Sequence, residues 1–480
     1  MDRYATSPAD RIPFHQKLVY GLGAFVNNLL AAASGGMMIV LNLGLGMNPA
    51  LVGLLGAIPR LTDAFTDPIM GYISDNTRTR WGRRRPYIFA GAIASGLTFA
   101  LLWHLPEGRG ESFYFWYFLI GSIIFYLAYT VFATPWVALG YELTPDYHER
   151  TRLMGVQNFM GQLAYVVAPW FLLFMQSEAI FDDMVDGAAG LAVIIAVVVA
   201  VVGVLPALFL RERFRDLAAA EAREHRPAEA GSALMRNLAG FFHGCAVTLR
   251  SKPFVKLCVA TFLVFNGFML VSSFQFYVII YYVFGGDMVR GAEYAGWAGT
   301  VQSIATFCVI ALVTWLATRI GKKRAFYLAI GVSMLGYALK WVCYDPQIPW
   351  LLLLPAPLLA FGLGGLFTIM PSMIADVVDL DELETHERRE GMYGSIFWWV
   401  VKLGMAAALA AGGFLLNATG FDVALQGNQS AFTITMMRLC DAFLPFVASG
   451  VAIWAIATFS ITEERAHEVR LALEARRGKV

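Results

Sequence analysis

The sequence is poor in charged residues. Asp, Glu, Lys and Arg make up 15% of its 480 residues, whereas hydrophobic residues make up 58%. Soluble domains average about 25% charged residues, so this composition predicts a chain that crosses a membrane several times and contacts lipid. The formal net charge of +1 gives no electrostatic reason to expect a nucleic-acid partner.

The sequence also lacks the motifs of several enzyme classes. Its five cysteines are scattered, and none has the CxxC or Cys/His spacing of a zinc site or a disulfide framework. It contains no phosphate-binding loop and no Ser/His/Asp arrangement. Residues 1–17 are polar and precede no cleavable apolar region, so we expect the first hydrophobic segment to insert and stay. We therefore expect neither an enzyme nor a resident metal or cofactor.

Long apolar runs are what the sequence has in abundance. A bilayer core about 30 Å thick needs roughly 20 apolar residues per helix, which predicts an all-α membrane protein. The seventh run is long enough that a tilt or a break is expected. The twelve predicted transmembrane helices are 18–43, 49–73, 87–105, 113–141, 153–176, 189–210, 254–284, 294–317, 325–343, 349–375, 392–416 and 431–461.

Lys and Arg are distributed unevenly over the segments between these helices. Of the 36 Lys and Arg residues, 29 fall in the termini and in the loops on the same side, and only Arg109 and Arg290 lie in the opposite loops. Cytoplasmic loops carry the excess of positive charge. We therefore predict cytoplasmic termini in a plasma (inner) membrane.

Two loop sequences occur twice, at a spacing of about half the chain. TRWGRRR at 79–85 returns as TRIGKKR at 318–324, and HER at 148–150 returns as HER at 386–388. Both pairs fall on the predicted cytoplasmic side, so the halves have the same orientation, as in the major facilitator fold with its parallel pseudo-symmetry. The predicted parts are a six-helix bundle at 1–210, a cytoplasmic linker at 211–252, and a second six-helix bundle with a cytoplasmic tail at 253–480.

Two carboxylates interrupt the second apolar run. Asp63 and Asp67 are four residues apart, so they share one face of a helix. A charge near the bilayer centre costs at least about 2.5–3.5 kcal/mol and usually faces a polar interior. Neighbouring carboxylates repel each other, which favours a proton or a bound cation. The pair indicates a coupling site for Na⁺ or H⁺; the alternative is an Arg60–Asp63 ion pair beside an interfacial Asp67.

Other polar residues in the apolar runs have two interpretations each. Lys402 lies in mid-span and either faces a central cavity or forms a structural ion pair. Trp398 either stacks on a sugar ring or packs between helices. Arg438 has Asp441 as its candidate partner. Asn27, Asn28, Thr130, Thr134 and Trp136 either bind substrate or join helices.

The arginine-rich stretch after the second run is interpreted as a structural and conformational element. It places five arginines in residues 78–85, directly after Asp75. The arginines are expected to hold the loop in the cytoplasm. Together with Asp75 they are expected to form a network that locks one conformation and opens in another.

Several segments of the chain resemble the glycoside–pentoside–hexuronide:cation symporters. They are KLVYGLGAF at 17–25, DAFTDPIMGYISDNTRTRWGRRRP at 63–86, TPW at 134–136 with its HER loop, and ADVVDLDELETHERREGMYGSIFWWVVKLG at 375–404. The resemblance covers nearly the whole chain, in order. It implies a cation-coupled secondary symporter that takes up a sugar, glycoside or uronide by alternating access.

The resemblance also implies roles for residues. The family's helix-two carboxylates match Asp63 and Asp67, its helix-four threonine matches Thr130, and its helix-eleven lysine matches Lys402. Thr66 stands where melibiose permeases have an asparagine, which leaves the choice among Na⁺, Li⁺ and H⁺ open.

The sugar site departs from the family pattern. Asn28 and Ala133 replace galactoside-binding acids, and Asn158 replaces an arginine. The family's helix-four tryptophan either shifts to Trp136 or is lost at Val137. A galactoside is therefore not expected. Animal lysophospholipid symporters belong to the same broad family, so a lipid substrate is the alternative.

The predicted sites fall into three sets, in a chain expected to be a monomer with no cofactor beyond its coupling cation. The cation-binding set is Asp63, Thr66, Asp67 and Thr130. The substrate-binding set is Asn28, Tyr129, Trp136, Asn158, Trp398 and Lys402. The gating set is Arg60, Asp75, Arg80, Arg84 and Arg319.

Overall fold

The computed structural model describes the backbone of residues 11–77, 79–106, 108–144, 147–212, 248–385 and 390–477. Within these ranges, the side chains of some helical residues, Asp63 and Asp75 among them, are not described. The statements below concern the described residues and side chains.

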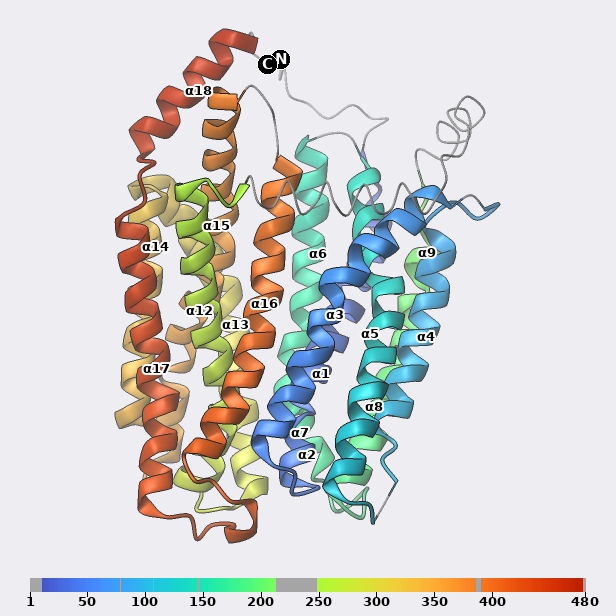
Figure 1. The fold of residues 1–480 in the computed structure, drawn as a ribbon, viewed down its shortest axis with the longest axis vertical. Helices are drawn as coiled ribbons and strands as arrows, with labels where there is room; N and C mark the ends of the chain where they lie inside the picture. The colour runs from blue at the N-terminus through green and yellow to red at the C-terminus, as the bar shows by residue number, and fades with distance from the viewer. Residues whose placement is uncertain are drawn as a thin grey trace. The chain divides into compact units, whose positions relative to one another are not determined.

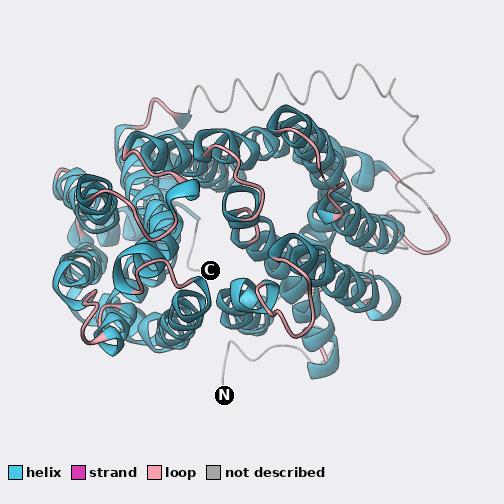
Figure 2. Cartoon of the chain, turned by 90° about the horizontal axis from the view of Figure 1, so that it is seen from below, coloured by secondary structure: helices cyan, strands magenta, loops and turns pink. Residues whose placement is uncertain are grey.

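The described residues form helices and, in these ranges, no strand (Figures 1 and 2). The helices up to residue 209 are α1 (Phe14–Gly36), α2 (Ile39–Leu43), α3 (Pro49–Asn76), α4 (Arg85–Trp103), α5 (Glu111–Glu142), α6 (Tyr147–Val167), η2 (Ala168–Trp170), α7 (Phe171–Met175), α8 (Met184–Gly203) and α9 (Leu205–Phe209). Those from residue 252 on are α12 (Lys252–Tyr277), η3 (Val278–Val283), α13 (Met288–Ile320), α14 (Lys322–Cys343), η4 (Pro349–Leu353), α15 (Ala356–Thr385), α16 (Glu390–Ala418), η5 (Val423–Leu425), α17 (Ala431–Ala457) and α18 (Glu463–Arg477).

The all-α membrane fold predicted from the apolar runs is confirmed. Among the described residues, eleven helical segments are long and apolar enough to cross a membrane. The second predicted span corresponds to α3, a helix of 28 residues, within which the described residues Pro49–Thr62 form a shorter apolar segment. The count of twelve spans therefore stays a prediction. The long seventh run forms one continuous helical segment, in which α12 continues into the π-helical segment η3, so the expected tilt or break stays a prediction.

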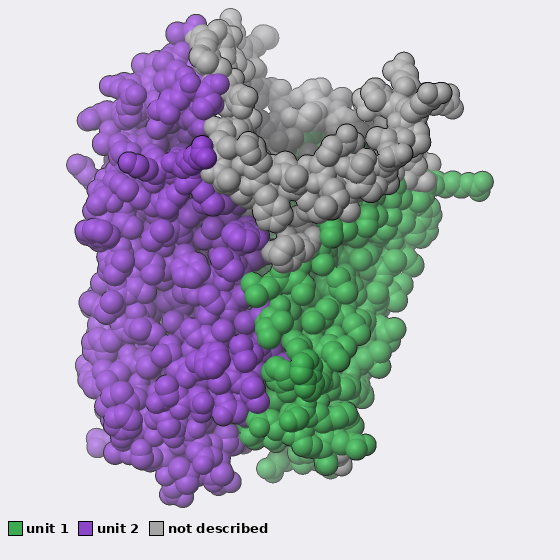
Figure 3. Space-filling view, in the orientation of Figure 1, with its two compact units in different colours: residues 1–47, 58–236 green, residues 48–57, 237–480 purple. Residues whose placement is uncertain are grey.

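Contacts divide the chain into two compact units (Figure 3). Unit 1 comprises residues 1–47 and 58–236, and unit 2 comprises residues 48–57 and 237–480. Most of the predicted linker lies outside the described residues, so its boundaries stay a prediction.

The first turns of α3 belong to unit 2 because of a close helix contact. A Cβ added to Gly53 would lie 2.7 Å from the carbonyl oxygen of Leu409 and 3.0 Å from Cα of Gly413 in α16. Glycines at this contact let the two backbones approach, as small residues do between membrane helices.

Each unit is built from helix pairs, some consecutive in the sequence and some distant. In unit 1, α1 packs on α6, and α4 packs on α5 and α8. In unit 2, α12 packs on α16 and α17, and α15 packs on α13 and α14. Buried apolar residues of α12, α14, α15 and α16 form the core of unit 2, with Phe254, Phe326, Met370 and Tyr393 among its members.

The duplicated loop has the same backbone feature in both copies. Gly82 has φ 111° before α4, and Gly321 has φ 84° before α14. Both values lie in the left-handed region that favours glycine. The sequence repeat is therefore also a structural repeat.

Candidate functional site

A cluster of side-chain oxygens joins α3 to α5 in unit 1. The Oδ1 atom of Asp67 accepts hydrogen bonds from the hydroxyls of Thr130 and Thr134, each at 3.2 Å. The hydroxyl of Thr66 lies 3.3 Å from that of Thr130. Thr130 and Thr134 are four residues apart on α5, so helical geometry places them on the same face toward Asp67. We call these four residues the oxygen cluster.

The oxygen cluster has the donor set of a cation site. Hard cations prefer carboxylate, carbonyl and hydroxyl oxygens as ligands. Its O–O distances of 3.2–3.3 Å exceed the usual 2.5–3.0 Å of O–H···O bonds. Each hydroxyl can rotate to offer a lone pair instead of its proton, so a cation bound at Asp67 would gain neutral ligands around one charge.

The predicted cation-binding set is partly assembled in these contacts. Thr66, Asp67 and Thr130 lie together. Asp63 lies one turn before Asp67 on α3, but its side chain is outside the described ones, so its role stays a prediction. Thr134 is the member that we did not assign to the cation from the sequence. Its spacing of four residues from Thr130 was the signal that would have identified it.

A second polar chain in unit 1 joins α1 to α5. The hydroxyl of Tyr129 donates to Oδ1 of Asn27 at 2.7 Å, and the amide of Asn27 donates to Oδ1 of Asn28 at 3.1 Å. The amide of Asn28 lies over Gly161 of α6, where an added Cβ would be 2.6 Å from it. Asn158 is exposed one turn before Gly161. The predicted substrate residues Asn28, Tyr129 and Asn158 therefore come from three adjoining helices.

Trp136 is buried within unit 1. Its side chain is 1% exposed, its ring stacks on Tyr20 and Phe132, and its indole N–H donates to the carbonyl oxygen of Tyr20 at 3.2 Å. These contacts indicate that Trp136 packs between α1 and α5. We therefore do not carry Trp136 into the proposed substrate site.

Unit 2 contributes the two remaining predicted substrate residues, both on α16. Trp398 is 54% exposed and stacks on Phe367, with ring centroids 5.9 Å apart. Lys402 follows one helical turn later and is half-buried. Trp398 and Lys402 therefore lie on one face of α16.

The arginine loop of unit 1 is organised by a carboxylate that the sequence analysis missed. The carboxylate of Glu212 accepts the backbone N–H groups of Arg83, Arg84 and Arg85, at 2.8, 2.8 and 3.1 Å. It caps the N-terminus of α4, where backbone N–H groups lack helical partners. The approach requires Gly82, because a Cβ there would lie 2.5 Å from the Glu212 carboxylate.

The predicted gating arginines have different environments. Arg84 is buried, and Arg80 is exposed. Arg60 of α3 places its guanidinium 4.8 Å from the ring centroid of Tyr126. Arg319 is exposed and lies 5.9 Å from the ring centroid of Trp315. The side chain of Asp75 is outside the described ones, so the gating network stays a prediction.

The second copy of the loop is anchored by two lysine side chains. Lys322 forms an ion pair with Asp376 of α15, with both carboxylate oxygens 2.7 Å from its ammonium. Lys323 donates to the carbonyl oxygens of Ala457 and Phe459 at the end of α17, both at 3.0 Å. Both copies thus tie their loop to another helix end, since in the first copy the guanidinium of Arg85 donates to the carbonyl oxygens of Ala207 and Leu208 in α9.

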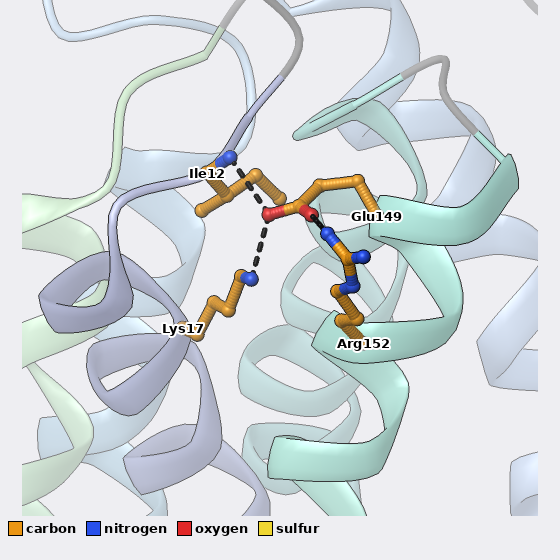
Figure 4. Close-up of polar contacts among 4 residues, drawn as sticks. All are labelled: Ile12, Lys17, Glu149 and Arg152. Carbon is orange, nitrogen blue, oxygen red and sulfur yellow. Dashed lines mark hydrogen bonds and ion pairs between the residues drawn. The ribbon is translucent and has the colours of Figure 1, made fainter. Parts of the chain in front are cut away.

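The first HER motif also has a structural role in unit 1 (Figure 4). Glu149, at the start of α6, accepts from the ammonium of Lys17 at 2.6 Å, from the backbone N–H of Ile12 at 3.0 Å, and from Arg152 at 3.2 Å. Burial alone would raise the pKa of Glu149, but these donors outweigh it and hold the pKa below its usual value. Glu149 therefore ties the start of α1 to the start of α6. The second HER motif lies outside the described residues.

One ion pair in unit 2 corrects an expectation from the sequence. Asp441 of α17 bonds to Lys340 of α14 at 2.5 Å, and each side chain is 1% exposed. Arg438, the partner that we expected for Asp441, bonds to the carbonyl oxygen of Trp341 at 2.6 Å. Adjacency on one helix suggested the Arg438–Asp441 pair. A lysine from another helix, which sequence spacing cannot reveal, takes that place.

Comparison with known proteins gives the family. The sequence model of the family described as MFS/sugar transport protein matches residues 19–463. The chain belongs to this family. Membership confirms the resemblance to the glycoside–pentoside–hexuronide:cation symporters, and it identifies a transporter and not an enzyme.

Three relatives match this family member over almost their whole length. An uncharacterized symporter of Synechocystis sp. is 28% identical, and the match covers 98% of each chain. The isoprimeverose transporter of Lactiplantibacillus pentosus is 24% identical over 95% of this chain and 92% of its own. Sodium-dependent lysophosphatidylcholine symporter 1 of Mus musculus is 24% identical over 96% of this chain and 88% of its own.

Solved structures support the fold. A bacterial homologue of the human lysosomal transporter Spinster matches with a TM-score of 0.66 and 15% identity, over 98% of this chain and 99% of that one. At this identity the similarity concerns the fold alone. The prediction of the major facilitator fold is confirmed.

Proposed function

We propose that the chain is a cation-coupled secondary symporter that takes up a sugar, glycoside or uronide by alternating access. The observation that carries this proposal is the oxygen cluster, in which Asp67 of α3 bonds to two hydroxyls of α5. Related proteins whose names state symport, including an isoprimeverose transporter, support the substrate class. The symporter acts as a monomer with no cofactor besides the coupling cation.

The cation binds first, at Asp67 together with Asp63. It cancels carboxylate charge in the membrane, where an uncompensated charge is costly. It also draws the hydroxyls of Thr130 and Thr134 toward α3, so the bound cation ties α5 to α3. Substrate then binds with higher affinity, because the helices that carry its polar contacts are already ordered.

Na⁺ fits the oxygen cluster better than H⁺ does. A proton needs only one carboxylate oxygen, whereas a metal cation needs several oxygen ligands. The cluster offers three hydroxyls around Asp67. Uptake driven by a Na⁺ gradient is therefore expected to exceed uptake driven by a pH gradient of equal size.

We propose one set of substrate contacts within unit 1 and, separately, a second set on α16 of unit 2. Asn28, Tyr129 and Asn158 supply amide and phenol groups that match sugar hydroxyls. Trp398 offers an exposed ring for a sugar face. Lys402 supplies a positive charge, which would favour a uronide over a neutral sugar.

Uptake into proteoliposomes tests the function. Radiolabelled pentosides, glycosides and uronides are offered with and without an inward Na⁺ gradient. We expect accumulation only with the gradient, and loss of accumulation in Asp63→Asn and Asp67→Asn. Asp422→Asn makes the same chemical change in an exposed loop and should transport normally. Full coupled uptake by both test variants would refute the site assignment.

A lysophospholipid symporter is the second candidate. The relative from Mus musculus named for sodium-dependent lysophosphatidylcholine symport motivates it. Thermal stabilisation of the purified protein distinguishes the two substrates. Sugars should protect in a Na⁺-dependent manner and lysolipids should not; the reverse result would favour the lipid.

A further inference from the structure

Three charged residues lie near one end of the helices of unit 2. Lys340 is three residues from the end of α14, and Arg438 and Asp441 are in the first half of α17. The π-helical segment η3, which carries Tyr282, ends at the same end of the bundle, since Tyr282 lies against Arg438. The mechanism proposed above uses none of these residues.

The charges do not cancel within the group. Lys340 and Asp441 neutralise each other, with their charged atoms 2.5 Å apart and both side chains 1% exposed. Arg438 keeps its charge at any pH at which the protein is folded. No carboxylate among the described residues forms an ion pair with Arg438. One positive charge is therefore left over.

The guanidinium of Arg438 lies close to two aromatic rings. Its centre lies 4.0 Å from the ring centroid of Tyr282 and 4.3 Å from that of Trp341. One of its five N–H groups donates to the carbonyl oxygen of Trp341. Arg438 lines a narrow cleft together with Lys340, Tyr344 and Asp441.

With α17 centred in the bilayer, the backbone of Arg438 lies about 5 Å inside the hydrocarbon layer. Helix α17 has 27 residues and is about 40 Å long, which exceeds a hydrocarbon core of about 30 Å by about 5 Å at each end. Arg438 lies seven residues from its start, about 10 Å along the axis. A long side chain at this depth reaches the headgroup level. Trp341, Tyr282 and Tyr344 are the aromatic residues typical of that level.

We propose that Arg438, at the mouth of this narrow cleft, binds the phosphate group of a membrane phospholipid. A planar guanidinium with further N–H donors matches a phosphate bidentately, and a phosphodiester supplies the missing negative charge. The Lys340–Asp441 pair forms the floor of the site and fixes the helices that carry it. The lipid binds between α14, α17 and η3 and stabilises unit 2. Aromatic rings beside the cleft contact its glycerol and the first acyl carbons.

Lipid titration of the purified, detergent-solubilised protein tests the proposal. The probes are dioctanoyl phosphatidylglycerol, dioctanoylglycerol, which has no phosphate, and inorganic phosphate. Thermal unfolding is measured against the concentration of each. We expect stabilisation by the phospholipid alone. In Arg438→Gln the apparent dissociation constant of that lipid should rise at least about tenfold, as for a lost charge-assisted hydrogen bond.

A matched variant keeps the test specific. Arg290→Gln also removes an arginine that lies over an aromatic ring, Phe284, outside the cleft, and it should bind the phospholipid like the wild type. Arg438→Lys keeps the charge without the planar donors and should bind more weakly than the wild type but better than Arg438→Gln.

Several results would overturn the proposal. Equal protection by dioctanoylglycerol would remove the role of the phosphate. Equal protection by inorganic phosphate would remove the role of the lipid. Unchanged lipid affinity in Arg438→Gln, or an equal loss in Arg290→Gln, would remove the role of Arg438. If Arg438→Gln does not fold, the proposal is tested by comparing the three probes on the wild type and by the lipid affinity of Arg438→Lys.

Discussion

The carboxylates of Asp67 in unit 1 and Asp441 in unit 2 have different kinds of bonding partner. Both are aspartates on helices that the sequence predicts to span the membrane. Asp441 bonds to the ammonium of Lys340, and both side chains are buried from solvent. Asp67 accepts hydrogen bonds from two threonine hydroxyls. The hydroxyls carry dipoles but no net charge, so a cation can bind the carboxylate beside them. At Asp441 the ammonium already occupies the place that a cation would take.

The difference is the one that we expect between a structural carboxylate and the proposed cation-binding carboxylate. A buried ion pair whose partners are both fixed holds two helices together. A carboxylate surrounded by rotatable hydroxyls can exchange its partner during a transport cycle. Glu149 and Glu212 extend the comparison to helix ends near the membrane surface. Glu149 has charged partners, and Glu212 has backbone N–H groups.

The largest expected effect on the free energy of unfolding comes from replacing Asp441. Asp441→Asn leaves Lys340 buried and unpaired, which should lower the free energy of unfolding by about 3–5 kcal/mol. Asp67→Asn keeps a side-chain oxygen for the hydroxyls of Thr130 and Thr134 and should change it by less than about 1 kcal/mol. Thermal inactivation half-lives in detergent measure both.

A double variant checks the cause of the Asp441 effect. Lys340→Met with Asp441→Leu removes both charges and should restore most of the lost stability, because a well-packed apolar pair often replaces a buried ion pair without loss. Equal destabilisation by Asp67→Asn and Asp441→Asn would abolish the distinction between the two aspartates.

The sequence predicted more of the fold than of the contacts. The membrane fold was predicted from the length of the apolar runs and from the uneven distribution of Lys and Arg. Its duplication was predicted from the repeated TRWGRRR and TRIGKKR loops. These signals can be read from single segments, or from two segments of similar sequence. Thr130 and Asp67 were predicted together only through the family resemblance. Lys340 with Asp441 and Glu212 with Gly82 were missed, because these partners are about 100 residues or more apart and belong to no motif that spacing reveals.

The second prediction concerns Glu149, where ion pairs lie at a helix start. Glu149→Gln should destabilise unit 1 by about 2 kcal/mol at pH 7, less than Asp441→Asn, because Arg152 is 61% exposed and remains solvated when its partner is lost. The pKa of Glu149 is lowered in the folded state, so its contribution is present above the usual value of 4.5 and is lost as the pH falls through the folded-state pKa.

Unfolding midpoints of wild type and Glu149→Gln between pH 7 and pH 4 measure the Glu149 effect. The gap between the two proteins should be widest at pH 7 and should narrow below pH 4.5. A gap that does not depend on pH would show that the charge of Glu149 is not what stabilises the junction.

The third prediction concerns Glu212, which bonds to neutral donors. Glu212→Gln places an amide where three backbone N–H groups need acceptors, so at least one of them loses its partner. The expected loss is about 1–2 kcal/mol. Glu178→Gln is the matched control in an exposed loop and should be neutral. If thermal unfolding of the two variants is the same, the Glu212 cap does not stabilise the arginine loop.

The smallest effect is expected from a substitution beside Asp67. It tests whether Na⁺ or H⁺ is the coupling cation. Thr134→Val keeps the shape of the side chain and removes one oxygen near Asp67. Loss of one neutral ligand worth about 1 kcal/mol should weaken Na⁺ binding about fivefold, while Thr134→Ser, which keeps the oxygen, should bind Na⁺ nearly as the wild type does. Na⁺-dependent thermal stabilisation gives the affinity. A proton on Asp67 does not need this oxygen, so unchanged Na⁺ affinity together with pH-driven uptake would assign the coupling to H⁺ and remove Thr134 from the site.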